Sequence, residues 1–131
     1  MRLPLLYALL ALSLPLGACA SLSSETRTEE SVFQAENVVD MMQTLTIARE
    51  PARYKEVGTL SLFTGAHPTP AQVEGYSVAL AGLHFCTTRL LSDEFSDKPW
   101  VVRGWEGASL AWKTQWIVHN HQVGLGFSSR F

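Results

Sequence analysis

Cysteine is scarce in this chain, and the sequence motifs of common catalytic sites are missing. The 131 residues include two cysteines, Cys19 and Cys86. The sequence has no Gly-x-Ser-x-Gly element, no Cys-His pattern and no phosphate-binding glycine loop. Ten basic and twelve acidic residues give a formal net charge of −2, which argues against a nucleic-acid partner. The sequence therefore favours a non-enzymatic protein and leaves a catalytic role as the alternative.

Long apolar runs are also missing, except at the N-terminus. Met1 and Arg2 precede an apolar stretch over residues 3–16, which Pro4, Ser13 and Pro15 interrupt. This stretch is shorter than the roughly 20 residues that a membrane-spanning helix needs. A basic start, an apolar core and small residues before a cleavage point are typical of a secretory signal peptide. The chain is therefore expected to leave the cytoplasm.

The signal ends in Leu16-Gly17-Ala18-Cys19, which resembles the lipobox of bacterial lipoproteins. The resemblance implies cleavage before Cys19, a diacylglycerol on its sulfur and a further acyl chain, such as palmitate, on the new amino terminus. Two or three acyl chains hold a protein stably at a membrane. Ala20, where lipoproteins of the inner membrane often carry Asp, implies sorting outward. We expect a cell-envelope lipoprotein at the periplasmic face of the outer membrane.

Three segments follow from these patterns. Residues 1–18 form the signal peptide, and residues 19–34 form the lipidated Cys19 with a flexible linker, because they are polar, acidic and without periodicity. Residues 35–131 form one small helical domain. After lipidation Cys86 is the remaining cysteine, and its apolar neighbours Leu83, Phe85 and Leu90 predict that it is buried.

Helical periodicity dominates the domain. A first helix is predicted from about residue 32 to residue 49, where Val38, Met41, Met42 and Leu45 recur at helical spacing and Pro51 follows. The patch 60–63 could form a short helical turn or a strand of four residues, and we favour the turn. A third helix is predicted from residue 100 to about 119 and contains all four tryptophans, with Glu106 and Lys113 away from their face. The tail 122–131 predicts a short strand or an irregular cover.

The second helix has the clearest start signal. Thr69 is a good N-cap, Pro70 suits the first helical position, and Gln72 completes a capping box. Gly75, Ala79, Gly82 and Cys86 form a stripe of small residues, which predicts close packing against a neighbouring helix. The fold class is therefore all-α, with three principal helices in a small bundle.

Five polar residues are candidates for an acid/base or ligand-binding site: Asp40, Glu56, His67, His84 and Glu106. Each also has a structural interpretation, since a lone histidine on an apolar helix is usually a satisfied core residue. Glu56 is predicted to hold its connection down by accepting hydrogen bonds from backbone N–H groups or nearby side chains. His119 and His121 are a weaker metal-binding alternative, because residues two apart diverge on a helix. We predict no metal and no cofactor.

The residues Gln43-Thr44-x-x-Ile47-Ala48-Arg49-x-Pro51-x-x-Tyr54-x-Glu56 resemble a family of small helical bacterial membrane-associated proteins of uncharacterised function. The likeness extends over about residues 40–127, and its further matches are Asp40, Gly65, His67, Pro68, Tyr76, Glu106, Asn120 and Gly124. Where the family has Asn-Pro after the glutamate, this chain has Val57-Gly58-Thr59. The resemblance implies a helical, membrane-proximal domain and no particular activity.

The leading hypothesis is an envelope lipoprotein that acts as an interaction or structural module. Its expected partners are the membrane, through the lipid anchor, and another envelope protein. The alternative is a small ligand-binding or hydrolytic domain that uses the clustered Asp, Glu and His residues. The two hypotheses differ in one observable, because a site requires these side chains to converge in space, whereas a structural role scatters them.

Overall fold

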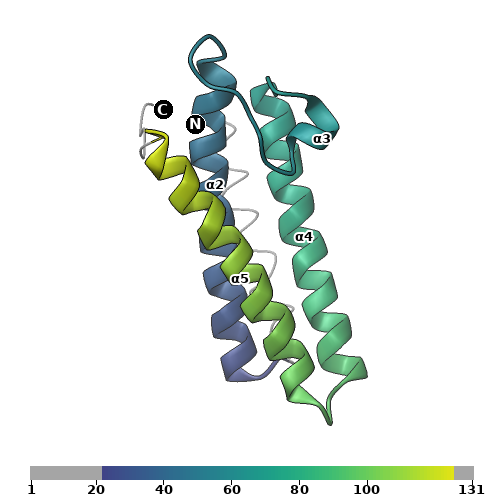
Figure 1. Ribbon diagram of the computed structural model, residues 1–131. Coiled ribbons are helices and arrows are strands. Elements are labelled where there is room, and N and C mark those ends of the chain that lie inside the picture. The colour runs from purple at the N-terminus through teal and green to yellow at the C-terminus, as the bar shows by residue number, and fades with distance from the viewer. Residues whose placement is uncertain (1–21, 126–131) are drawn as a thin grey trace, which may run out of the picture.

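The computed structural model describes residues 22–125, which form four helices and no strand (Figure 1). The helices are α2 (Ser24–Arg49), α3 (Ser61–Thr64), α4 (Pro70–Glu94) and α5 (Pro99–Gln122). The predicted all-α bundle with three principal helices is confirmed, and α3 is the turn expected near residues 60–63. The predictions for the signal peptide, for Cys19 and for tail residues 126–131 fall outside the described residues.

The three long helices run side by side, with α4 antiparallel to both α2 and α5 (Figure 1). Helix α2 packs against both α4 and α5, which also contact each other. This order brings the start of α2, the end of α4 and the start of α5 together at one end of the bundle. The end of α2, the start of α4 and the end of α5 meet at the other end, beside the connection that carries α3.

Local capping explains where the helices begin. The Thr69 hydroxyl accepts a hydrogen bond from the Gln72 backbone N–H (3.3 Å), and the Gln72 side chain accepts one from the Thr69 N–H (2.8 Å). This is the predicted capping box, with Pro70 at the first helical position. Ser23 caps α2 by accepting from the Thr26 N–H at 3.1 Å. These contacts satisfy backbone donors that the helices leave unpaired.

The first helix begins earlier than predicted. Helix α2 starts at Ser24, so most of the segment assigned to the flexible linker is helical and packed. Glu30 and Phe33 are each 1% exposed, and Gln34 is 5% exposed. The prediction failed because polarity was interpreted as solvation, whereas these polar side chains face the other two long helices.

The interior of the bundle is largely polar. Among the described residues, nine buried side chains are hydrophobic and thirteen are polar or charged. The polar ones follow one face of each long helix: Thr26, Glu30, Gln34, Asn37, Gln43 and Thr44 on α2, Ser77, His84 and Thr88 on α4, and Glu106, Ser109, Lys113 and Asn120 on α5. Glu106 and Lys113, predicted to lie away from the packed face, are therefore in the core.

Helix α4 presents its small-residue stripe to the outside, contrary to prediction. Gly75, Ala79, Gly82 and Cys86 are all exposed, and a Cβ built on either glycine would meet no atom within 4 Å. Apolar neighbours join them: Val78 (44% exposed), Leu83 (66%) and Leu90 (68%). We call these seven residues the α4 outer face. Across residues 22–125, no helix has the length and apolar character that a bilayer crossing requires.

Candidate functional site

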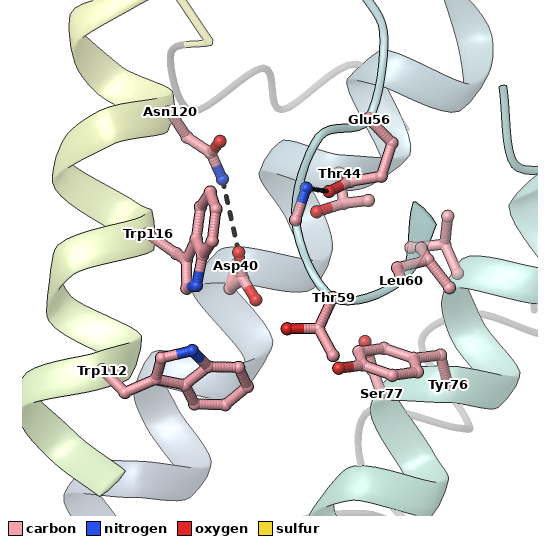
Figure 2. A pocket seen from close by; sticks show the side chains of 12 residues that line it. Asp40, Thr44, Glu56, Thr59, Leu60, Tyr76, Ser77, Trp112, Trp116 and Asn120 are labelled. Carbon is pink, nitrogen blue, oxygen red and sulfur yellow. Dashed lines mark hydrogen bonds between the residues drawn. The ribbon is translucent and has the colours of Figure 1, made fainter. Parts of the chain in front are cut away.

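A small cavity lies between the three long helices at the end of the bundle that carries the connection (Figure 2). Its volume is about 30 Å³, which is enough to hold a water-sized group. The wall combines residues of α2, α4, α5 and the connection: Asp40, Thr44, Glu56, Gly58, Thr59, Leu60, Val73, Tyr76, Ser77, Trp112, Trp116 and Asn120. Five of these, Asp40, Thr44, Glu56, Tyr76 and Asn120, are among the residues on which the predicted family likeness was based.

Asp40 is held by two partners from α5. The Lys113 ammonium donates to one carboxylate oxygen at 2.6 Å, and the Asn120 amide donates to the other at 3.3 Å. Asn120 also donates to the Gln43 side chain at 3.2 Å. Lys113 is 1% exposed and the Asp40 side chain 19% exposed, so this ion pair is largely buried, and it neutralises the charge of Asp40.

Glu56 enters the cavity from the connection. One of its carboxylate oxygens accepts a hydrogen bond from the Gly58 backbone N–H at 2.6 Å. Glycine permits this approach, since a Cβ at position 58 would lie 2.7 Å from that oxygen. The predicted backbone hydrogen bond is thus present, although it joins the loop to itself and not to a helix. Burial raises the pKa of Glu56, the Gly58 hydrogen bond opposes this shift, and the charge of Asp40 adds to it.

Aromatic rings complete the wall. Trp112 and Trp116 come from α5 on one side, and Tyr76 comes from α4 on the other (Figure 2). Burial raises the pKa of the Tyr76 phenol, and the charges of Asp40 and Glu56 raise it further. The phenol therefore stays neutral at physiological pH and offers a hydroxyl and a ring face.

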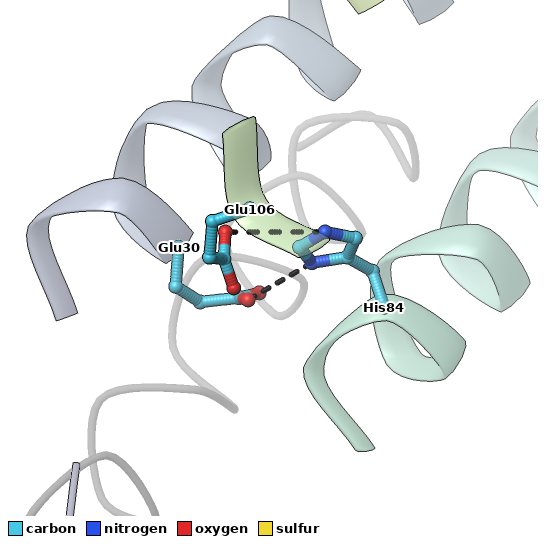
Figure 3. Close-up of side chains that lie close together, drawn as sticks. All are labelled: Glu30, His84 and Glu106. Carbon is cyan, nitrogen blue, oxygen red and sulfur yellow. Dashed lines mark hydrogen bonds and ion pairs between the residues drawn. The ribbon is translucent and has the colours of Figure 1, made fainter. Parts of the chain in front are cut away.

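A second polar cluster, Glu30, His84 and Glu106, lies at the opposite end of the bundle (Figure 3). The three side chains come from α2, α4 and α5, and each is at most 3% exposed. His84 Nδ1 lies 2.9 Å from Glu30 Oε2, and His84 Nε2 lies 4.0 Å from Glu106 Oε2. The imidazole stacks between two rings, with centroid distances of 3.5 Å to Phe33 and 5.0 Å to Trp105.

The two carboxyl groups of this cluster titrate differently. For Glu30, burial disfavours the charge, but hydrogen bonds from His84 and Gln34 outweigh it and lower the pKa. For Glu106, burial dominates and raises the pKa to about 6, against the hydrogen bond from Thr88 and the charge of His84. Divergent environments of this kind often mark functional carboxylates.

The structure brings the predicted site residues together in two separate places. Asp40 and Glu56 share the cavity, whereas His84 and Glu106 share the buried cluster. His67 is exposed and joins neither. His119 and His121 are exposed in the last turn of α5, and the described residues supply no third ligand beside them. The metal alternative at this pair is therefore not supported.

Sequence analysis missed Glu30 and Lys113 as site residues. Glu30 falls in the predicted linker, and Lys113 falls on the predicted charged outer face. A signal was present: Glu30, Gln34 and Asn37 are spaced four and three apart, which is the spacing of a helix face that packs on a partner. The spacing is easily overlooked because the stripe is polar.

Comparison of this chain with protein-family models, with curated proteins and with solved structures finds no match. The fold and the two clusters are therefore interpreted from their own geometry.

Proposed function

We propose that this protein is an envelope lipoprotein whose helical domain binds a small ammonium-type cation in the cavity between Asp40, Glu56 and the aromatic wall. The observation that carries the proposal is the convergence of two predicted carboxylates with three aromatic residues on one cavity. The cavity borders the solvent-exposed connection, whereas the Glu30, His84 and Glu106 side chains are enclosed. It is therefore the better location for a ligand that must enter and leave.

The charge balance favours a cation. Lys113 already neutralises Asp40, so Glu56 supplies a further negative charge to the cavity. The raised pKa of Glu56 indicates a carboxylate with too little compensation for its burial. A bound cation would provide that compensation, while a bound anion would be repelled by the Glu56 carboxylate.

Size and aromatic character narrow the ligand class. Tryptophan faces attract cations through their ring quadrupole. A cavity of about 30 Å³ has room for a water-sized group such as a primary ammonium, whose N–H groups can donate hydrogen bonds that a trimethylammonium group cannot. The ligand would therefore be the ammonium ion or the amine end of a larger molecule. The hydroxyls of Thr59 and Tyr76 hydrogen-bond to each other at the cavity wall and keep lone pairs that can accept from the ligand.

Tryptophan fluorescence can test this binding, because two of the four tryptophans line the cavity. We expect methylammonium chloride to change the emission of the detergent-solubilised lipoprotein saturably, and tetramethylammonium chloride at equal ionic strength to have little effect. Glu56→Gln should weaken methylammonium binding by about tenfold, the loss of one charge-assisted contact. Glu94→Gln changes the same charge at an exposed position of α4 and is the control. Wild-type affinity in Glu56→Gln, or no saturable response, would refute the proposal.

The membrane attachment is supported by Leu16-Gly17-Ala18-Cys19 and is tested separately. The mass of the mature wild-type chain should correspond to residues 19–131 with attached acyl chains. Cys19→Ala should accumulate as the unprocessed chain. An unlipidated wild-type N-terminus would exclude the anchor while leaving the cavity proposal intact.

The α4 outer face favours a second candidate function, docking of the domain on an apolar partner in the envelope. Contiguous exposed apolar side chains often mark interaction surfaces. An environment-sensitive fluorophore on Cys86, at the centre of this face, should shift to the blue when the lipoprotein meets its partner protein or lipid. Unchanged emission in isolated membranes would eliminate docking through this face.

A further inference from the structure

Neighbouring side chains outside the Glu30, His84 and Glu106 cluster hydrogen-bond to its two carboxylates. The Gln34 amide donates to Glu30 Oε1 at 2.5 Å, and the Thr88 hydroxyl donates to Glu106 Oε1 at 2.6 Å. Each contact holds one oxygen of a carboxylate and leaves the other, Oε2, facing His84. Outer contacts of this kind orient the ligands of metal ions in proteins.

Two atoms at the centre of the cluster lack hydrogen-bond partners. Within residues 22–125, neither His84 Nε2 nor Glu106 Oε2 has one, although both side chains are almost completely buried. They face each other across 4.0 Å, which is too long for a hydrogen bond. Buried polar atoms without partners are rare, and an ion between them is one of the few physical explanations.

We propose that Glu30, His84 and Glu106 bind one divalent transition-metal ion of the zinc or ferrous class. Each residue offers one donor atom, and the three donors lie within 4.8 Å of one another. To bind the ion beside His84 Nε2, Glu30 Oε2 would give up its hydrogen bond with His84 Nδ1. Donors around such an ion lie about 2.0–2.2 Å from it, so a small closure of the side chains brings all three into range. Two carboxylates and a neutral imidazole balance the charge of a divalent ion.

The donor set selects the class of metal. An imidazole nitrogen suits zinc and iron better than magnesium or calcium, which prefer oxygen ligands throughout. The position suggests a structural ion, because the rings of Phe33 and Trp105 enclose the imidazole and one ligand comes from each long helix. The ion would fasten the end of the bundle opposite the cation cavity, so the inference is independent of the proposed function.

Metal analysis of the full lipoprotein in detergent tests the inference. After treatment with EDTA, the protein should take up one equivalent of Zn²⁺ per chain and melt at a higher temperature, while Mg²⁺ should produce neither effect. Co²⁺ should give a visible absorption band of a nitrogen- and oxygen-coordinated ion. Absence of stoichiometric Zn²⁺ and of the Co²⁺ band in the wild type would overturn the proposal without any variant.

Two variants locate the ion. Glu106→Gln keeps the size of the side chain and its oxygen acceptor for Thr88, removes one ligand and should weaken Zn²⁺ binding by about 100-fold or more. The double variant His119→Ala/His121→Ala removes the exposed pair on α5 and should bind as the wild type does. Loss of binding in the double variant with retention in Glu106→Gln would place the ion at the surface and refute the buried site.

Discussion

The buried pair of Lys113 and Asp40 shows how individual residues determine the character of this core. Lys113 extends through the interior to reach Asp40 at 2.6 Å, and its ammonium also lies 5.4 Å from the Trp112 ring centroid. A charge in this place is tolerable only because its partner is present. The pair therefore makes the two residues dependent on each other.

Removal of one charge of this pair should destabilise the fold, whereas removal of both charges should have little effect on its stability. Lys113→Met leaves the Asp40 carboxylate, which is 19% exposed, without its counter-ion and should destabilise the fold by about 3 kcal/mol. Asp40→Asn added to Lys113→Met should recover most of that loss, because the side-chain amide introduced at position 40 keeps an oxygen that can accept from Asn120. Chemical denaturation of both variants measures the difference. Equal stabilities for the single and double variants would mean that the pair is not coupled.

Glu56 should give the fold a pH dependence. Its pKa is raised in the folded state above the ordinary value of 4.5, so folding favours the protonated form. The associated stability is complete below about pH 4.5 and is lost as the pH rises through the raised folded pKa. The groups that act on it are Asp40 of α2, which raises its pKa, and Lys113 of α5, which lowers it.

The melting temperature of Glu56→Gln should therefore rise relative to that of the wild type as the pH increases from about 4 to about 7. Glutamine retains an oxygen that can accept from the Gly58 N–H and carries no charge. Glu94→Gln, on the exposed end of α4, should show a difference that hardly varies with pH. If the melting temperature of the wild type instead rises relative to that of Glu56→Gln as the pH increases, the ionised carboxylate stabilises the connection.

At the scale of elements, the sequence predicted ends and types of helices better than their buried faces. The capping box at Thr69 and the stop near Pro51 depend on neighbours within four residues, so they were visible in the sequence. Which face of α4 points inward depends on α2, far away along the chain. His84 can be buried because it contacts Glu30 and Glu106. Both partners are distant in the sequence, so the residues around His84 do not predict these contacts. For the same reason the sequence could not show that Asp40 and Glu56 lie in one place and His84 and Glu106 in another.

The exposed glycines of α4 lead to a prediction opposite to the one that tight packing would give. Gly82 lies inside a helix with free space around its Cβ position, so Gly82→Ala should stabilise the fold by about 0.5–1 kcal/mol through reduced chain entropy. Gly58→Ala is the contrasting variant, because its Cβ would displace the Glu56 carboxylate and cost about 1 kcal/mol. Denaturation midpoints compare the two. A loss of stability in Gly82→Ala would indicate a neighbour on the α4 outer face.

At the scale of the whole molecule, the bundle has an uncommon distribution of side chains. Polar groups connect the three long helices from Glu30 at one end to Asn120 at the other, while Leu83, Leu90 and Trp100 face outward. Among the described residues, the continuous hydrophobic cluster is small and consists of Leu45, Leu60 and Val73 with Met41, Ala48 and Tyr76 against it. The fold therefore depends on specific polar pairing as well as on apolar burial.

This distribution has a calorimetric consequence. Exposure of apolar surface raises the heat capacity on unfolding, whereas exposure of polar surface lowers it. A domain in which buried polar side chains outnumber hydrophobic ones should therefore unfold with a heat-capacity increment below the usual value of about 12–15 cal/mol/K per residue. Its stability curve should be correspondingly flat, so that the folded population changes little with temperature well below the melting point. Cold would then weaken this domain less than it weakens one with an ordinary apolar core.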